Sequence, residues 1–298
     1  MAVFQKKTTL VHHITYMGIM TAINLIFIVL AFYFPPLMFL LIFLLPFVSA
    51  VVSYYCLKRY YLIYAIASVG LCLIIDLGNT IFYLVPALIT GFVIGLLLEK
   101  KINPFWLILS STLIESVITF ALIPLISLIG NVDDIVSYTF TLLGLENFAY
   151  QTEIKYLFIF FISLVQCALT HFVLLSDAKK IGIEVNTNVS FYSPYIIGAE
   201  LSIILCLSLS FFYVPLALVF FAISIYFAVF LLIDLLLSKK ISIYILLGSL
   251  FVTSLFVFAL LYTKINQPLG LLILIIFPFV IVLVSFVNNY LLKEATNN

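Results

Sequence analysis

Three polar side chains near the middle of long apolar runs are the residues best placed to do chemistry. Glu115 sits on a stripe with Ser111 and Thr119 at four-residue spacing, and Asn24 and Gln166 lie at similar depth in two other apolar runs. In a membrane, a charge at that depth costs at least about 2.5 to 3.5 kcal/mol and needs a partner or a cavity. The pattern predicts either a small-molecule cavity lined by these residues or an interhelical hydrogen-bond cluster in which Glu115 is protonated.

A second polar group follows another apolar run. Asp76, Asn79 and Tyr83 surround Gly78. A polar turn with a glycine can line the mouth of an outward-facing binding site, and Asp76 can equally cap the helix that follows. The candidate substrate-binding residues are therefore Asn24, Asp76, Asn79, Tyr83, Glu115 and Gln166.

Catalytic chemistry has weaker support. His171, Glu200 and Asp234 fall at comparable depths, and an acid beside a histidine can relay protons, as an intramembrane enzyme would require. The sequence contains no nucleotide-binding loop, catalytic triad, zinc motif or dinucleotide fingerprint. Its four cysteines are isolated within apolar segments. We expect no enzyme activity, no cofactor and no metal, and any energy from ATP must come from another subunit.

The composition predicts an all-α, polytopic membrane protein. Charged residues make up 8% of the 298 positions and hydrophobic residues 66%, against roughly 25% and 45–50% in a soluble domain. Uncharged runs of about 20 residues recur, each long enough to cross a hydrocarbon layer of roughly 30 Å. They lack the in/out alternation of barrel strands, so helices are expected. A net charge of +1 argues against nucleic acid as a partner.

The apolar runs, separated by charged or Pro/Gly positions, predict about ten transmembrane helices. Residues 1–180 are predicted to form a six-helix bundle and residues 190–298 a four-helix region, joined by a polar linker. The predicted spans are Ile14 to Phe34, Pro36 to Cys56, Tyr60 to Ile75, Thr80 to Leu98, Pro104 to Ile129, Ile154 to Ser176, Pro194 to Phe212, Val214 to Leu237, Ser242 to Tyr262 and Pro268 to Leu291.

The positions of the basic residues predict the orientation. With ten spans and a cytoplasmic N-terminus, only Lys155 and Lys264 fall outside, which leaves 11 of the 13 Lys and Arg inside. Cytoplasmic loops of membrane proteins carry this excess of positive charge. Adding or removing one span would reverse the side of every later pair. The expected location is a bacterial cell membrane, with both termini in the cytoplasm.

Small residues mark two helix faces. Gly18 and Ala22 are four residues apart in the first run, and Ala87, Gly91 and Gly95 share one face of the fourth. Such faces let helices approach closely. We expect the fourth-helix face to pack internally and the first-helix pair to be available for a partner.

The first half resembles the substrate-binding S-components of energy-coupling-factor vitamin transporters. The resemblance rests on the basic start, the segment from Thr15 to Ala22, the Pro36 to Pro46 entry into the second helix, and the segment from Phe82 to Gly91. The whole chain, with further helices after a linker, is similar to the YybS-like family of uncharacterised bacterial membrane proteins.

This resemblance implies a six-helix bundle with its binding site beneath the outer loops. It also implies that the first helix docks through Gly18 and Ala22 on a membrane-embedded coupling subunit that works with ATPases, although Gly18 replaces the more usual alanine. A small, vitamin-like molecule would be the substrate. The alternative is a non-transporting membrane scaffold or assembly protein, in which the polar residues only pack helices together.

The orientation can be tested by cysteine labelling in a background without the native cysteines. A cysteine at Asp133 should react with an impermeant reagent added outside intact cells, and one at Lys179 should react only after the membrane is opened, because the two positions are predicted on opposite sides. Labelling of both from the same side would contradict the ten-helix topology.

Overall fold

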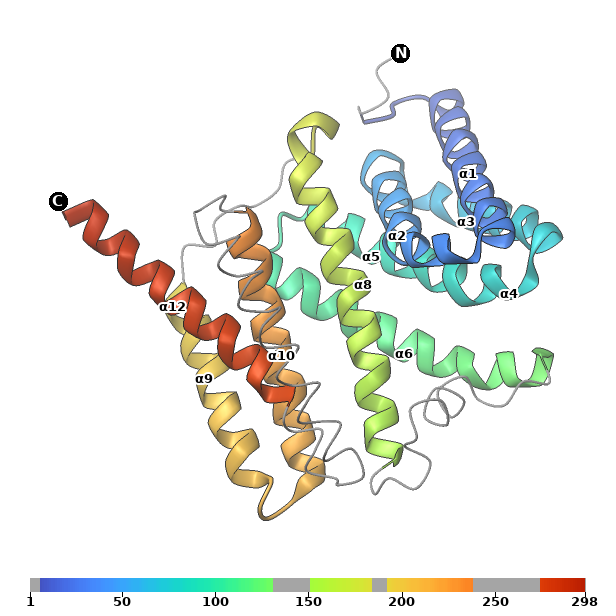
Figure 1. The fold of residues 1–298 in the computed structure, drawn as a ribbon. Helices are drawn as coiled ribbons and strands as arrows, with labels where there is room; N and C mark the ends of the chain where they lie inside the picture. The colour runs from blue at the N-terminus through green and yellow to red at the C-terminus, as the bar shows by residue number, and fades with distance from the viewer. Residues whose placement is uncertain (1–5, 131–150, 184–191, 238–273, 298) are drawn as a thin grey trace. The chain divides into compact units, whose positions relative to one another are not determined.

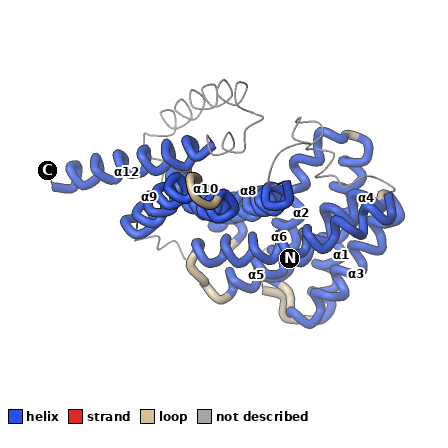
Figure 2. Tube along the Cα trace, turned by 90° about the horizontal axis from the view of Figure 1, so that it is seen from below, coloured by secondary structure: helices blue, strands red, loops and turns tan. Residues whose placement is uncertain are grey.

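The computed structural model describes residues 6–130, 151–183, 192–237 and 274–297 (Figure 1). Every regular element in these ranges is a helix (Figure 2), which confirms the predicted all-α class. Within them, six helices are long and apolar enough to cross a membrane, and three shorter apolar helices accompany them. The count of about ten stays a prediction, because the span Ser242 to Tyr262, the loop around Asp133 and most of the linker lie outside the described residues.

The chain divides into two compact units. The first comprises Met1–Asp134 and Ile162–Asn188, and the second Ile135–Phe161 and Val189–Asn298. Helix α8 (Gln151–Ile181) belongs to both units: its residues up to Phe161 are part of the second unit, and those from Ile162 onward are part of the first. The predicted domains, 1–180 and 190–298, differ from these units in assigning the whole of α8 to the first bundle.

The first unit is a bundle in which α2 and α5 pack most closely, with α1 against α2 and α3, and α6 against α5 (Figure 1). A short 3-10 turn precedes α2, so this helix begins after the two prolines rather than at Pro36. Besides α8, the elements are α1 (Leu10–Tyr33), η1 (Pro35–Leu37), α2 (Met38–Tyr55), α3 (Lys58–Ile75), α4 (Leu77–Asn79), η2 (Thr80–Leu84), α5 (Val85–Glu99) and α6 (Pro104–Gly130).

The second unit is built on a helical hairpin. Helices α9 (Tyr192–Leu209) and α10 (Val214–Leu237) pack along each other, joined by a turn over residues 210–213, and α12 (Ile276–Asn297) contacts both. Aromatic contacts join these helices. The ring centroids of Tyr195 on α9 and Phe230 on α10 are 4.9 Å apart, and those of Phe161 on α8 and Phe221 on α10 are 5.7 Å apart.

Glycine allows the close approach of α2 and α5. A Cβ atom added at Gly91 would lie 2.6 Å from the carbonyl oxygen of Pro46, and one at Gly95 would lie 2.7 Å from that of Ala50. The hydroxyl of Ser53 uses this proximity to donate a hydrogen bond of 2.9 Å to the carbonyl of Phe92. The internal packing predicted for this glycine face is therefore what the structure shows.

One wide turn interrupts the helix that runs from α4 into α5. Its backbone is π-helical over Thr80–Leu84, where the N–H of Val85 donates to the carbonyl of Thr80 five residues earlier. The cause is Pro86, which has no N–H and whose ring would crowd the carbonyl of Phe82. Single π turns are frequent at functional sites, and this one carries Tyr83.

The surface of the described helices is unusually apolar, and several polar side chains are buried. Large apolar side chains face outward: Val117 is 67% exposed and Ile74 79%. Polar groups lie inside, where Ser68 is fully buried and Glu115 is 2% exposed. Extended apolar surface of this kind requires an apolar environment, so the helices described here suit a multi-pass membrane protein.

The glycine contact predicts that Gly91→Ala lowers the stability of the detergent-solubilised protein by about 1 to 3 kcal/mol, because the added methyl group overpacks against α2. Thermal unfolding would measure the loss. The matched control is Gly70→Ala on α3, where nothing lies within 4 Å of the added atom and a better helix former should be neutral or stabilising. Equal melting temperatures for Gly91→Ala and the unaltered protein would contradict the close contact.

Candidate functional site

The structure pairs two of the predicted site residues inside the first unit. Glu115 on α6 forms a side-chain hydrogen bond with Gln166 on α8. Both residues are buried, at 2% and 7% exposure. The Cys167 thiol lies beside Glu115 and Thr112. These polar contacts therefore join α6 to α8.

Several oxygens around this pair have no hydrogen-bond partner. They are one carboxyl oxygen of Glu115, Oε2, and the hydroxyls of Ser111 and Ser163, each within one helical turn of the pair. A buried polar group without a partner costs about 1 to 3 kcal/mol, so a cluster of them is expensive. These groups are able to accept and donate further hydrogen bonds. Thr119, on the same stripe in the sequence, is only half-buried.

Asn24 belongs to a different contact. Its Nδ2 donates to the Tyr64 hydroxyl at 2.8 Å and to Ser68 Oγ at 3.4 Å, both on α3. Thr21, one turn earlier on α1, also meets Ser68, at 3.1 Å. The hydrogen bonds of Asn24 thus go to α3 and those of Glu115 to α8, so the predicted trio is divided between two places. One oxygen of Asn24, Oδ1, is left without a partner.

Asp76 and Asn79 are hydrogen-bonded to each other at the start of α4. The Asn79 N–H donates to Asp76 Oδ1 at 3.1 Å, and its Nδ2 donates to Asp76 Oδ2 at 2.7 Å. The Thr80 hydroxyl donates to the Asp76 carbonyl at 2.6 Å. These are the contacts of a helix N-cap. Tyr83 is half-buried on the π turn, where its ring meets that of Phe82.

The two small-residue faces differ in what covers them. Gly18 and Ala22 are exposed on α1, and nothing lies within 4 Å of a Cβ atom added at Gly18. Gly91 and Gly95 are instead filled by α2. Within the described chain, the α1 face is open and the α5 face is occupied.

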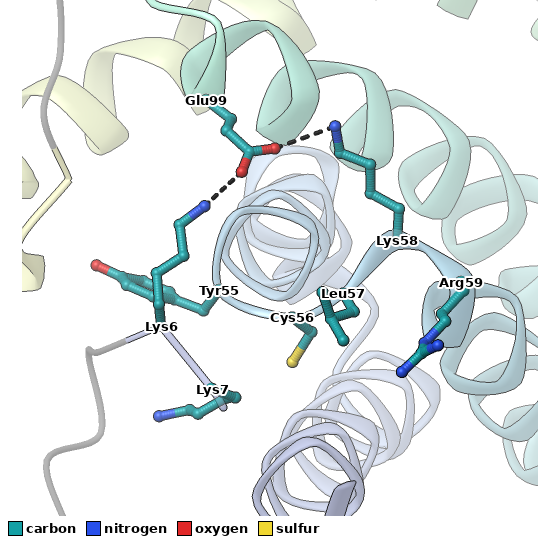
Figure 3. A pocket seen from close by; sticks show the side chains of 8 residues that line it. All are labelled: Lys6, Lys7, Tyr55, Cys56, Leu57, Lys58, Arg59 and Glu99. Atoms are coloured by element: carbon teal, nitrogen blue, oxygen red, sulfur yellow. Dashed lines mark hydrogen bonds and ion pairs between the residues drawn. The ribbon is translucent and has the colours of Figure 1, made fainter. Parts of the chain in front are cut away.

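A basic pocket of about 530 Å³ lies where the N-terminal segment meets the ends of three helices (Figure 3). Glu99 is held by Lys6 and by Lys58, the latter at 3.1 Å. Burial raises the pKa of the Cys56 thiol to about 11, so the thiol is uncharged at neutral pH. The lining residues are Lys6, Lys7, Tyr55, Cys56, Leu57, Lys58, Arg59 and Glu99.

From the sequence, the lysines and Arg59 predicted only which loops are cytoplasmic, and the pocket was not predicted. The available signal was that two basic pairs, Lys6–Lys7 and Lys58–Arg59, stand at the same predicted membrane face in consecutive connections.

The trio considered for proton transfer is divided between the two units. His171 is fully buried in the first unit and has no hydrogen-bond partner. Glu200 lines an apolar groove between α9 and α12 in the second unit. The side chain of Asp234 lies outside the described residues. Among the residues searched, no three His, Cys, Asp or Glu side chains gather as a metal site would require.

The Glu115–Gln166 contact predicts that Glu115→Gln leaves the melting temperature nearly unchanged, because the amide keeps the shape and the hydrogen bond. Glu115→Leu should lower stability by about 1 to 3 kcal/mol, because Gln166 loses its partner. Val117→Leu, on the exposed side of the same helix, is the control and should have little effect. A gain in stability for Glu115→Leu would contradict the paired arrangement.

Comparison with known proteins leaves the site to be interpreted from its own geometry. No protein-family model, curated protein or solved structure matches the chain. The resemblance to S-components and to the YybS-like family therefore stays an expectation, based on the residues quoted above.

Proposed function

We propose that this chain is a membrane transport protein, an S-component-like subunit for uptake of a small, vitamin-like molecule across a bacterial cell membrane. In this proposal both termini are cytoplasmic, and energy comes from a separate coupling subunit with its ATPases. The observation that carries the proposal is the contrast between the two small-residue faces: the one on α5 is filled by the chain itself, and the one on α1 is open.

An open small-residue face in lipid is suited to a helix from another subunit. Apolar side chains gain little by leaving lipid for a protein surface, so helices associate in membranes through close backbone approach. Gly18 and Ala22 permit that approach, and α1 offers them at the surface of the first unit. A coupling subunit embedded in the same membrane is the proposed partner.

The polar groups between α6 and α8 are the proposed substrate contacts. Glu115 and Gln166 are joined, while the hydroxyls of Ser111 and Ser163 have no partner among the described residues. A small molecule with hydrogen-bonding groups would satisfy them. Asn24 has one unsatisfied oxygen on α1, and Asp76, Asn79 and Tyr83 lie at the other candidate position, near the predicted outer end of the bundle.

A non-transporting scaffold or assembly protein is the second candidate. It is favoured by the contacts of Asn24 with Tyr64 and Ser68 and by the N-cap at Asp76, because these polar groups bond to one another as packing residues do. Native mass spectrometry of the gently purified protein separates the candidates. A co-purifying small molecule that is released by changes at Glu115 supports transport, and its absence favours the scaffold.

The coupling face predicts that Gly18→Leu or Ala22→Leu prevents co-purification of the ATPase module with the chain expressed in its native membrane. Each leucine would hold a partner helix a few ångströms away, yet it should leave the melting temperature nearly unchanged because the face is open. Ile26→Leu, further along α1 and also exposed, is the control and should retain the module. Normal capture by both test variants would remove the main support for this proposal.

A further inference from the structure

The basic pocket gathers cations from two distant parts of the sequence around a single acid. Lys6 and Lys7 come from the segment before α1, and Lys58 and Arg59 from the first turn of α3. Glu99, at the end of α5, is the one acidic side chain in the lining. Four cations and one carboxylate leave a net charge of +3. An excess of positive charge in a concave site attracts anions.

The cations are held in place by the fold. Lys7 is only 9% exposed, and its N–H donates to the Tyr55 carbonyl at 3.0 Å. Its ammonium lies 4.3 Å from the centre of the Tyr16 ring, and the Arg59 guanidinium lies 4.7 Å from that of Tyr60. Figure 3 shows Lys6 and Lys58 on either side of Glu99, with Lys7 and Arg59 further from that carboxylate. Contact with the Tyr60 ring orients the Arg59 guanidinium in the pocket.

The start of α3 adds to the positive potential. Its N-cap residue, Leu57, makes no side-chain capping bond, so backbone N–H groups remain at the positive end of the helix dipole. Acidic residues are preferred in the first turn of a helix, yet this turn begins with Lys58 and Arg59. An anion in the pocket would meet both the side-chain charges and the helix terminus.

We propose that this pocket binds the phosphate group of a phosphoester anion at the predicted inner surface of the membrane. Arginine and lysine together suit a tetrahedral anion with several oxygens, because the guanidinium donates two parallel hydrogen bonds and the ammonium contributes a compact charge. A cavity of about 530 Å³ has room for a phosphate with a small attached group. The proposal is independent of whether the chain transports a substrate.

Two sources can supply this chemistry: an anionic phospholipid headgroup or a soluble phosphate compound. The helices beside the pocket carry exposed apolar side chains within their first two turns, Val11 and Ile14 on α1 and Leu62 and Ile63 on α3. These surfaces suit acyl chains. The inner leaflet of a cell membrane is also rich in anionic lipid, which attracts basic segments.

The test uses the full chain in micelles of neutral detergent. Phosphatidylglycerol and phosphatidylcholine are titrated in parallel and bound lipid is counted by native mass spectrometry. In a separate arm, inorganic phosphate is titrated by calorimetry. We expect preference for phosphatidylglycerol, binding of inorganic phosphate, or both, and affinity for the anion that binds should fall about fivefold for each cation removed in Arg59→Gln and in Lys7→Gln/Arg59→Gln.

The control is Lys100→Gln/Lys180→Gln, which removes two charges from the same predicted membrane face outside the pocket and should bind as the unaltered protein does. Preference for phosphatidylglycerol without phosphate binding assigns the site to a lipid headgroup, and phosphate binding without lipid preference assigns it to a soluble phosphoester. Binding of neither probe, or equal losses in the pocket and control variants, would overturn the proposal. Arg59→Gln alone changes an exposed side chain, so it tests the site even if loss of buried Lys7 unfolds the protein.

Discussion

Two helices in lipid gain little from burying apolar side chains against each other, because the lipid tails are as apolar as leucine. Association must come from close packing and from hydrogen bonds. The contact of α2 with α5 supplies both, since Gly91 and Gly95 leave room for the α2 backbone and Ser53 donates to the carbonyl of Phe92. This packing also holds the end of α5 near the end of α2, where residues of both helices line the basic pocket. The end of α5 places Glu99 beside Lys6 and Lys58, so the basic pocket depends on the same glycines.

The same environment explains why polar residues lie inside and why their bonding is uneven. On the α1–α3 side, Asn24, Tyr64 and Ser68 bond to one another across the helices, as packing residues in a membrane do. Between α6 and α8, Glu115 bonds to Gln166, but neighbouring hydroxyls have no partner. A structural cluster has no need of these unpaired groups, whereas a ligand site does. The proposed substrate contacts are therefore placed on the α6–α8 side, and the α1–α3 contacts are interpreted as packing.

Hydropathy was sufficient to predict most of the helices. The predicted span Val214 to Leu237 coincides with α10, and the predicted span from Tyr60 ends with α3 at Ile75. The grouping of site residues was only partly predictable, because depth in the membrane is one coordinate and gives neither the rotation of a helix nor its neighbours. Asn24, Glu115 and Gln166 share a predicted depth, yet Asn24 forms its hydrogen bonds with α3. The π turn before Pro86 also altered the rotation of the segment that carries Tyr83.

Charged residues at the ends of membrane helices have two separable effects. They orient the chain during insertion through their number on each side, and for this purpose a lysine needs only to remain in water or among headgroups. Lys7 does not simply remain in water or among headgroups. It is largely buried, its backbone N–H donates to the Tyr55 carbonyl, and its ammonium lies over the Tyr16 ring. Burying a cation costs free energy that orientation alone does not repay. The anion site proposed above gives Lys7 and Arg59 a role in the pocket beyond the orientation of the chain.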